Sequence, residues 1–227
     1  MDLSDRAMKA RVSRRHLMLG TAAAAAAAGM APLRWARAAD DRTAAAKSSH
    51  FPFGPVVPAR PIAPWQIVTH TCKTGKLNTL LEGRISAVQL MFTGCSATCP
   101  IQGAVFAQAQ RLLSETKPAA GAGAAPAVQF VSLTIDPLGD DPRRLSAWLR
   151  GFDAAPNWWA GAPRIEDVDK LIGVLGRGGE PQPVGNDPHT GQVFIVNSRS
   201  ELVHRTIGMA PAKTIVEALQ MVASGRA

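Results

Sequence analysis

An apolar run, a pair of cysteines and the start of a helix follow one another in the stretch ISAVQLMFTGCSATCP, residues 85–100. The run at 85–92 is apolar along most of its length, which predicts a strand buried on both faces. Over residues 100–115 the apolar side chains recur at helical spacing. We therefore expect Cys95 and Cys99 to lie between a central strand and the first turn of a helix.

Strands and helices are predicted to alternate along the rest of the domain. A second buried strand is expected at 128–135, and the strand–helix–strand order favours a parallel, right-handed crossover. Further strands are predicted at 65–68, 77–81, 192–197 and 202–206, and further helices at 142–152 (capped by Asp141), 165–175 and 211–222. This order predicts an α/β fold in which a central mixed sheet is flanked by helices on both faces.

Residues 1–39 have the three parts of an export signal. The twin-arginine pattern SRRHLM at 13–18 precedes an alanine run at 22–28 and the small-residue cleavage pattern ARAA at 36–39. The weakly hydrophobic run and the nearby arginines favour the twin-arginine pathway over the ordinary secretory route. We predict a twin-arginine signal peptide and a periplasmic protein, which reaches the membrane only through an uncleaved leader or a membrane-bound partner.

The predicted signal peptide is followed by two regions of different composition. Residues 40–64 are polar and then rich in proline, which predicts a linker. Residues 65–227 contain the alternating strands and helices and are predicted to form one domain. We see no internal repeat in this part of the sequence.

Composition argues against nucleic-acid binding. The 227 residues carry a formal net charge of +8, but the first 38 contribute seven Lys or Arg against two Asp, which leaves +3 for the rest. That remainder has no cluster of basic residues with interleaved aromatics. Charged residues make up 19% and hydrophobic residues 46% of the chain, which excludes a disordered polyelectrolyte. Three cysteines are too few for a disulfide scaffold.

The placement of Cys95 and Cys99 indicates redox or metal chemistry. A helix N-terminus favours the thiolate, which is the form that attacks disulfides and binds soft metals. The spacing of four residues puts both sulfurs on one side of a turn. A purely structural disulfide is a weaker alternative, because so small a loop gains little stability from closure. The residues alone leave a local disulfide, a thiol-exchange centre and a metal-binding pair open.

Three segments of the sequence resemble the Sco/SenC family. FTGCSATCP at 92–100 is similar to the family signature F-T-x-C-x-x-x-C-P, and VSLTIDPLGDDP at 131–142 is similar to its V-S-x-D-P-x-x-D stretch. DPHTGQVFIVN at 187–197 is similar to the family's D-H-S/T stretch before an apolar strand, although a proline here separates the aspartate from His189. The resemblance spans roughly residues 51–224.

This resemblance implies a thioredoxin-like copper protein that assists assembly of the dinuclear copper site of cytochrome oxidase. The family's copper ligands map onto Cys95, Cys99 and His189, and copper is implied in both the Cu(I) and Cu(II) states. Two soft thiolates suit Cu(I), and an imidazole adds a borderline third donor. The implied partner is the copper subunit of cytochrome oxidase or another periplasmic copper or thiol protein.

A second hypothesis uses the same cysteines without copper. One thiolate of the pair attacks a disulfide in a partner, and the other cysteine resolves the mixed disulfide, as in a thiol–disulfide oxidoreductase. His189 is then incidental. Copper delivery is the favoured hypothesis, so whether the protein is an enzyme stays open at this point.

Simpler interpretations suit the other titratable residues. His204 is predicted to be a partly exposed strand residue and Cys72 a lone thiol in a turn, with a two-donor metal site from His70 and Cys72 as the weaker alternative. Asp136 is expected to shape the turn after the second central strand, or to orient a ligand through a hydrogen bond. Asp136 and Asp140 are not spaced like a general acid–base pair.

Overall fold

The computed structural model describes residues 53–115, 127–176 and 191–225. The chain divides into two units, residues 1–47 and 48–227, and all described residues belong to the second. Along the chain the described elements are β1 (Gly54–Pro61), β2 (Gln66–Thr69), β3 (Thr74–Lys76), α1 (Leu77–Leu81), β4 (Arg84–Met91), α2 (Thr98–Glu115), β5 (Ala127–Thr134), α3 (Pro142–Gly151), β6 (Trp158–Pro163), a 3₁₀ turn (Ile165–Asp167), α4 (Val168–Leu175), β7 (Val193–Val196), β8 (Glu201–Arg205) and α5 (Ala212–Ala223).

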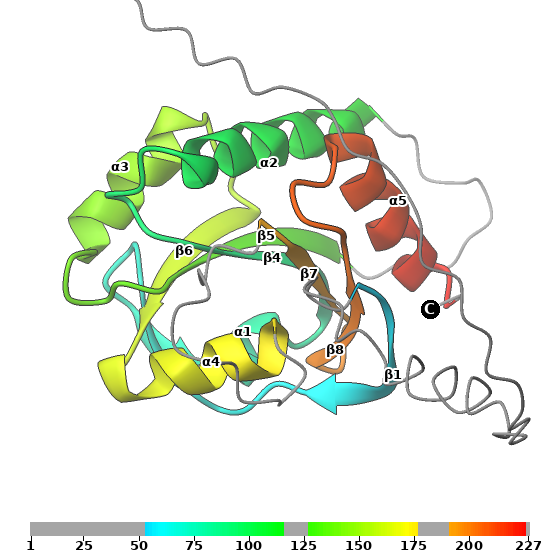
Figure 1. Cartoon of the computed structure of the whole chain (residues 1–227), viewed down its shortest axis with the longest axis horizontal. Coiled ribbons are helices and arrows are strands. Elements are labelled where there is room, and N and C mark those ends of the chain that lie inside the picture. Colours follow the sequence, from blue (N-terminus) through cyan, green and yellow to red (C-terminus); the bar gives the residue numbers. More distant parts are fainter. Residues whose placement is uncertain (1–52, 116–126, 177–190, 226–227) are drawn as a thin grey trace, which may run out of the picture. The chain divides into compact units, whose positions relative to one another are not determined.

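One eight-stranded sheet organises the domain, in the order β1-β8-β7-β4-β5-β6-β2-β3. Helices α2, α3 and α5 cover one face, and α1 and α4 cover the other (Figure 1). Because successive side chains of a strand point to opposite faces of the sheet, each central strand contributes residues to the hydrophobic core on both faces. On β4, for example, Ala87 and Met91 belong to the core under α2 and α5, whereas Val88 and Leu90 belong to the core under α4. The predicted arrangement of a mixed sheet with helices on both faces is confirmed.

The central strands β4 and β5 are parallel and end at the same edge of the sheet. Their register pairs Met91 with Thr134, the last residue of each strand. The pairing continues one step further, because the backbone N–H of Ile135 donates to the carbonyl of Met91 at 2.9 Å. The segments that follow the two strands therefore begin side by side, which brings the cysteine segment next to the loop before α3.

Four elements differ from the sequence-based expectations, and one of them is strand β3, which is not predicted from the sequence. The predicted linker 40–64 is wrong over Gly54–Pro61, because that stretch forms strand β1 at the sheet edge. Prolines fit there, since an edge strand needs ladder hydrogen bonds on one side only, and the register with β8 is irregular. The strand predicted at 77–81 is helix α1, whose buried Leu77 and Leu81 are one helical turn apart. Strand β6 is not predicted at all.

The other predicted elements match the structure closely. The helix predicted at 142–152 is α3, and Asp141 caps it by accepting a hydrogen bond from the backbone N–H of Arg144 at 2.7 Å. The two strands predicted at 192–197 and 202–206 form the antiparallel pair β7–β8. The predicted signal peptide lies outside the described residues. Among those that are described, no helix has the length and apolar character needed to cross a membrane.

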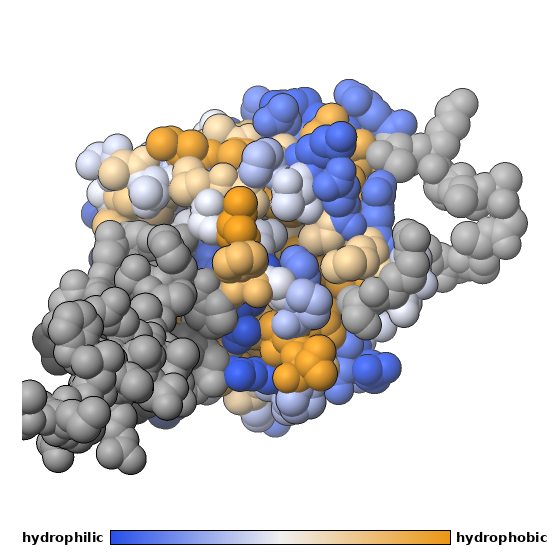
Figure 2. Space-filling view, turned by 45° about the vertical axis from the view of Figure 1, so that its right-hand side comes forward, coloured by the Kyte–Doolittle hydropathy of each residue, from blue (hydrophilic) through white to orange (hydrophobic). Residues whose placement is uncertain are grey.

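Exposed large hydrophobic side chains come from several different elements of the domain. They are Phe53, Val57, Val68, Ile101, Leu138, Ile165, Ile207 and Met209. On the face seen in Figure 2, hydrophobic residues lie in separate small groups among hydrophilic ones. Scattered exposed apolar residues of this kind are ordinary for a protein surface.

Candidate metal and thiol site

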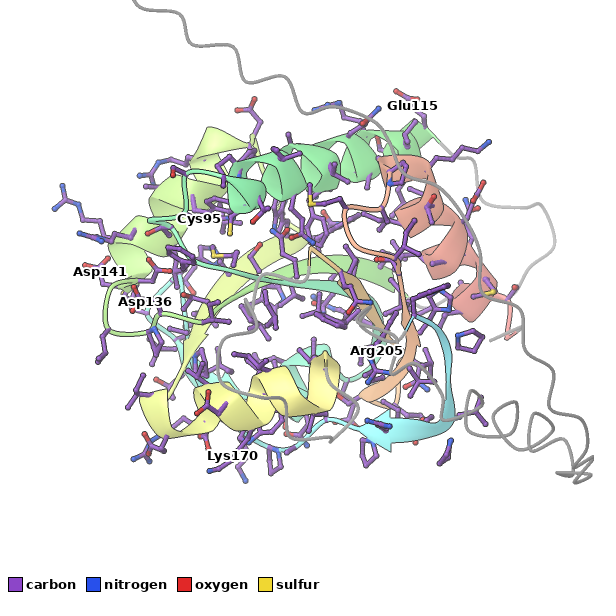
Figure 3. All side chains as sticks on the ribbon, viewed as in Figure 1. Cys95, Glu115, Asp136, Asp141, Lys170 and Arg205 are labelled. Carbon is purple, nitrogen blue, oxygen red and sulfur yellow. The ribbon has the colours of Figure 1, made fainter. Side chains whose placement is uncertain are left out.

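Cys95, which is labelled in Figure 3, and Cys99 lie where strand β4 ends and helix α2 begins. Both are free thiols; Cys95 is partly exposed, whereas Cys99 is buried, with 2% of its surface accessible. A turn precedes the helix, in which the backbone N–H of Cys95 donates to the carbonyl of Phe92 at 3.2 Å. We call residues 92–99 the thiol turn. It presents one thiol to solvent and places the other behind it.

The partly exposed thiol is the more acidic of the two. Partial burial acts to raise the pKa of Cys95, but hydrogen bonds from the backbone N–H groups of Cys99 and Ala97 outweigh it. Hydrogen bonds with the Cys99 thiol and the Thr98 hydroxyl act in the same direction, and the pKa of Cys95 falls to about 7. The sulfur of Cys95 thus accepts hydrogen bonds from backbone N–H groups at the start of a helix, where an anionic group is favoured.

The buried thiol has the opposite shift. Burial raises the pKa of Cys99 to about 11, against a hydrogen bond with the backbone of Phe92 that lowers it. The hydrogen bond with Cys95 and the charge of that neighbour raise it further. Near neutral pH Cys95 is therefore about half in the thiolate form, whereas Cys99 keeps its proton. The two sulfurs are close enough to interact directly, as the predicted spacing requires.

A buried carboxylate anchors the thiol turn to the neighbouring strand. The side chain of Asp140, 2% exposed, accepts the backbone N–H of Thr93 at 3.0 and 3.2 Å on its two oxygens. It also accepts the Thr93 hydroxyl, and the Thr134 hydroxyl at 2.5 Å. Thr93 lies two residues before Cys95 and Thr134 ends β5. Asp140 therefore joins the segments that follow the two central strands.

The hydrogen bonds of Asp140 are not predicted from the sequence, because its partners are 47 and 6 residues away. The parallel register of β4 and β5 is the feature that could have indicated them. Asp136, by contrast, shapes the turn as predicted. Its carboxylate accepts the backbone N–H of Gly139 at 3.1 Å and its carbonyl accepts that of Asp140 at 2.9 Å.

Helix α2 also contacts the start of strand β7. Gln102, three residues after Cys99 and only 4% exposed, donates its side-chain amide to the carbonyls of Gly191 at 3.2 Å and Gln192 at 3.1 Å. The Gly191 carbonyl also accepts the backbone N–H of Met209 at 2.8 Å. This position needs glycine, because its φ is +58° and a Cβ atom would lie 2.9 Å from the Met209 sulfur.

The structure brings together two of the three predicted ligands. His189 lies outside the described residues, which resume at Gly191. Within the described ranges no group of three or more His, Cys, Asp or Glu side chains is arranged to hold a metal ion. Cys72 is an exposed thiol in the turn between β2 and β3, as predicted. His204 on β8 is half-buried, and burial lowers its pKa.

These features define a class of protein. A cysteine pair that opens a helix directly after a central parallel strand, in a mixed sheet covered on both faces, is the arrangement of a thioredoxin-like protein with a redox or metal-binding thiol pair. The chain belongs to the SCO1/SenC family, whose model matches residues 58–224. The resemblance seen in the sequence is thereby confirmed. A search of curated proteins finds no match.

Solved structures of Sco proteins share this fold. A SCO1/SenC family lipoprotein from Bacillus anthracis is 22% identical, with a TM-score of 0.59 over 74% of this chain and 97% of its own. BsSco, described as a member of the Sco family of cytochrome c oxidase assembly proteins with a disulfide switch, is 17% identical, with a TM-score of 0.59 over 74% and 95%. Yeast Sco1 with copper bound is 18% identical, with a TM-score of 0.56 over 73% and 89%.

Proposed function

We propose that this protein is a periplasmic copper metallochaperone. Cys95, Cys99 and His189 hold one copper ion, as Cu(I) or Cu(II), and pass it to the copper subunit of a respiratory oxidase. Transfer takes place by ligand exchange, in which donor atoms of the partner replace the three ligands one at a time. Copper is the cargo of this reaction.

The link between helix α2 and Gly191 carries the proposal. Gln102 holds the Gly191 carbonyl one helical turn from Cys99. His189 precedes Gly191 by two residues, and two trans peptide units span at most about 7.6 Å. Chain connectivity thus supports a site in which the imidazole comes from the start of β7 and the thiols from the start of α2.

The donor set fits copper. Two thiolates are soft ligands that suit Cu(I), and a neutral imidazole suits either oxidation state. Cys95 lies partly exposed at the surface, so that a partner has access to the ion. Three ligands also leave room for a fourth donor from the partner.

The relatives support copper and the oxidase as cargo and partner. Yeast Sco1 was solved with copper bound, and BsSco is described as belonging to a family of cytochrome c oxidase assembly proteins. The Bacillus anthracis relative is described as a lipoprotein, which agrees with an exported chain. The twin-arginine pattern at 13–18 supports export to the periplasm.

Anaerobic Cu(I) titration of the reduced protein tests the proposal. We expect saturation at about one equivalent in the wild type and loss of tight binding in the Cys95→Ser/Cys99→Ser double variant. His189→Ala should weaken Cu(II) binding more than Cu(I) binding, because two thiolates alone satisfy Cu(I) better than Cu(II). Equal copper binding by the wild type and the double cysteine variant would refute the proposal, and Cys72→Ser serves as the control thiol variant.

The unequal thiols favour thiol–disulfide exchange as a second candidate function. The thiolate of Cys95 attacks a disulfide in the partner and releases one partner thiolate. Cys99 then loses its proton and attacks the sulfur of Cys95, which releases the second partner thiolate and leaves a Cys95–Cys99 disulfide. A partly exposed attacking thiol and a buried resolving thiol are the arrangement that this sequence of steps requires.

Trapping of the mixed disulfide distinguishes the second function from the first. Cys99→Ser should accumulate a stable adduct through Cys95 when mixed with a disulfide-containing periplasmic copper protein. Cys95→Ser is the matched control and should form none. Copper binding without any adduct would support the metallochaperone and contradict thiol–disulfide exchange. Adduct formation without copper binding would support the oxidoreductase.

A further inference from the structure

The carboxylate of Asp140 holds the thiol turn in place, and neither proposed function has yet given it a part. It is buried in the loop between β5 and α3. Its two oxygens accept the backbone N–H of Thr93 at 3.0 and 3.2 Å, and one of them also accepts the Thr93 hydroxyl. The other accepts the hydroxyl of Thr134 at 2.5 Å. A buried acceptor with several donors fixes the separation of the segments that supply them.

The residue that Asp140 anchors is next to a backbone unit that contacts both cysteines. The carbonyl of Phe92, directly before Thr93, accepts the backbone N–H of Cys95 at 3.2 Å. The backbone of Phe92 also forms a hydrogen bond with the buried thiol of Cys99. By fixing Thr93, Asp140 therefore fixes the backbone that determines where Cys95 lies relative to Cys99.

The two cysteines differ in how firmly the fold holds them. Cys99 belongs to the first turn of α2 and is buried, whereas Cys95 precedes the helix and is partly exposed. Both are free thiols, and their side chains form a hydrogen bond with each other. To form a disulfide, the sulfurs must move from this contact to bonding distance, and Cys95 is the cysteine with the freer backbone. Because Thr93 is fixed two residues before it, that movement strains the hydrogen bonds to Asp140.

We propose that Asp140 is a positioning residue that favours the reduced form of the Cys95–Cys99 pair over its disulfide. It acts through Thr93, whose backbone and hydroxyl it holds. The inference rests on the proposed function, because only the reduced pair offers thiolates to Cu(I). A pair that resists closure stays ready for copper in the periplasm, which is an oxidising compartment.

The test is the equilibrium of the copper-free pair with glutathione. Two glutathione molecules give two electrons and two protons to the Cys95–Cys99 disulfide, which yields two cysteine thiols and one glutathione disulfide. Every protein in the series carries Cys72→Ser, which removes the third thiol. Acid quenching, alkylation and mass spectrometry give the reduced fraction at each glutathione ratio. A variant that destabilises the reduced and the oxidised protein alike does not move this equilibrium, which separates positioning from stability.

Loss of the bonds to Thr93 should favour the disulfide. We expect Asp140→Ala to shift the equilibrium about tenfold, which lowers the reduction potential by about 30 mV. Thr93→Val keeps the side-chain shape and loses only the hydroxyl, so that a shift of about threefold is expected. Thr134→Val removes a hydroxyl from the same carboxylate on the strand side, and Asp141→Ala removes the cap of α3. Both should shift the equilibrium less than about twofold, since neither removes a bond to Thr93.

The outcomes separate this inference from the proposed function. If the wild type binds Cu(I) but Asp140→Ala and Thr93→Val leave the glutathione equilibrium unchanged, the positioning role is overturned and the copper function stands. A shift in Thr134→Val as large as that in Thr93→Val also overturns it, as does a wild type that forms no disulfide at any ratio. If the expected shifts occur but the wild type binds no Cu(I), the copper function is overturned and the positioning role holds for thiol exchange. If Asp140→Ala fails to fold, as judged by circular dichroism, Thr93→Val decides in its place.

Discussion

Helices α2 and α3 begin in the same part of the molecule but use different acceptors for their free N–H groups. Helix α3 begins with a conventional cap, in which the carboxylate of Asp141 accepts the N–H of Arg144 at 2.7 Å and a proline follows the cap. At the start of α2 the sulfur of Cys95 accepts the N–H groups of Ala97 and Cys99. A thiolate thus takes the place that a side-chain oxygen occupies in α3.

The difference shows that hydrogen bonds from the free N–H groups at a helix start stabilise the fold in α3 and increase the reactivity of a cysteine in α2. A carboxylate is already ionised at neutral pH, so that its hydrogen bond only stabilises the helix. A thiol is ordinarily protonated at that pH, and the same N–H groups shift its ionisation to about 7. Asp140 joins the two helix starts, because it directly precedes the cap of α3 and binds Thr93 in the thiol turn.

The largest expected effect comes from breaking this junction. Asp140→Ala leaves the Thr93 N–H and the Thr93 and Thr134 hydroxyls without their buried acceptor, and should lower the free energy of unfolding by about 3 kcal/mol. Urea denaturation of the reduced protein measures this. The control is Asp136→Ala, whose exposed carboxylate accepts one N–H at 3.1 Å and should cost less than about 1 kcal/mol. Equal losses in the two variants would contradict the assigned role of Asp140.

The second effect is the unequal reactivity of the two thiols. With pKa values of about 7 and about 11, thiolate populations at pH 7 favour Cys95 by about 10⁴, and the lower nucleophilicity of the more acidic thiolate offsets about 10² of this. We expect alkylation of Cys95 to be about 100-fold faster in the copper-free protein. Its rate should rise with pH through a midpoint near 7, because deprotonation creates the nucleophile.

Tandem mass spectrometry of partly alkylated wild-type protein, over a range of pH, resolves the two sites. Cys72, which is exposed, provides an internal comparison in the same sample. A midpoint for Cys95 near the ordinary thiol value, or equal rates at Cys95 and Cys99, would show that the N–H groups of α2 do not stabilise the thiolate.

The smallest effect is expected from the conventional cap. Asp141→Ala should destabilise the protein by about 1 kcal/mol, the usual cost of losing a helix cap. It should leave the alkylation rate of Cys95 unchanged, because Asp141 bonds to α3 and not to the thiol turn. Calorimetric unfolding and the alkylation assay together test this. A changed thiol midpoint would mean that the two helix starts are coupled more tightly than their hydrogen bonds indicate.

The parts of the site that the sequence predicts are the local ones. Cys95 and Cys99 are four residues apart at a strand–helix junction, so that hydrophobic periodicity is enough to place them. Asp141 is equally local to its helix. The contact of Asp140 with Thr93 and that of Gln102 with Gly191 depend on strand order and register, which connect residues 47 and 89 positions apart.

The same distinction explains the errors in the fold. Strand β1 was not predicted because it contains prolines, which disfavour a strand. They are tolerated here because pairing with β8 at the sheet edge requires few N–H donors. Helix α1 is only five residues long, and so short a leucine-rich segment also fits a strand. Strand β6 depends on parallel pairing with β5, a contact between segments that no local pattern encodes.

X-ray absorption spectroscopy of the copper-loaded protein most directly tests whether two thiolates and one imidazole share a single ion. For Cu(II) bound to the wild type we predict two sulfur scatterers and one imidazole, with the imidazole contribution absent from His189→Ala. Persistence of that contribution in His189→Ala, or a first shell that contains no sulfur, would contradict the assignment of Cys95, Cys99 and His189 as the copper ligands.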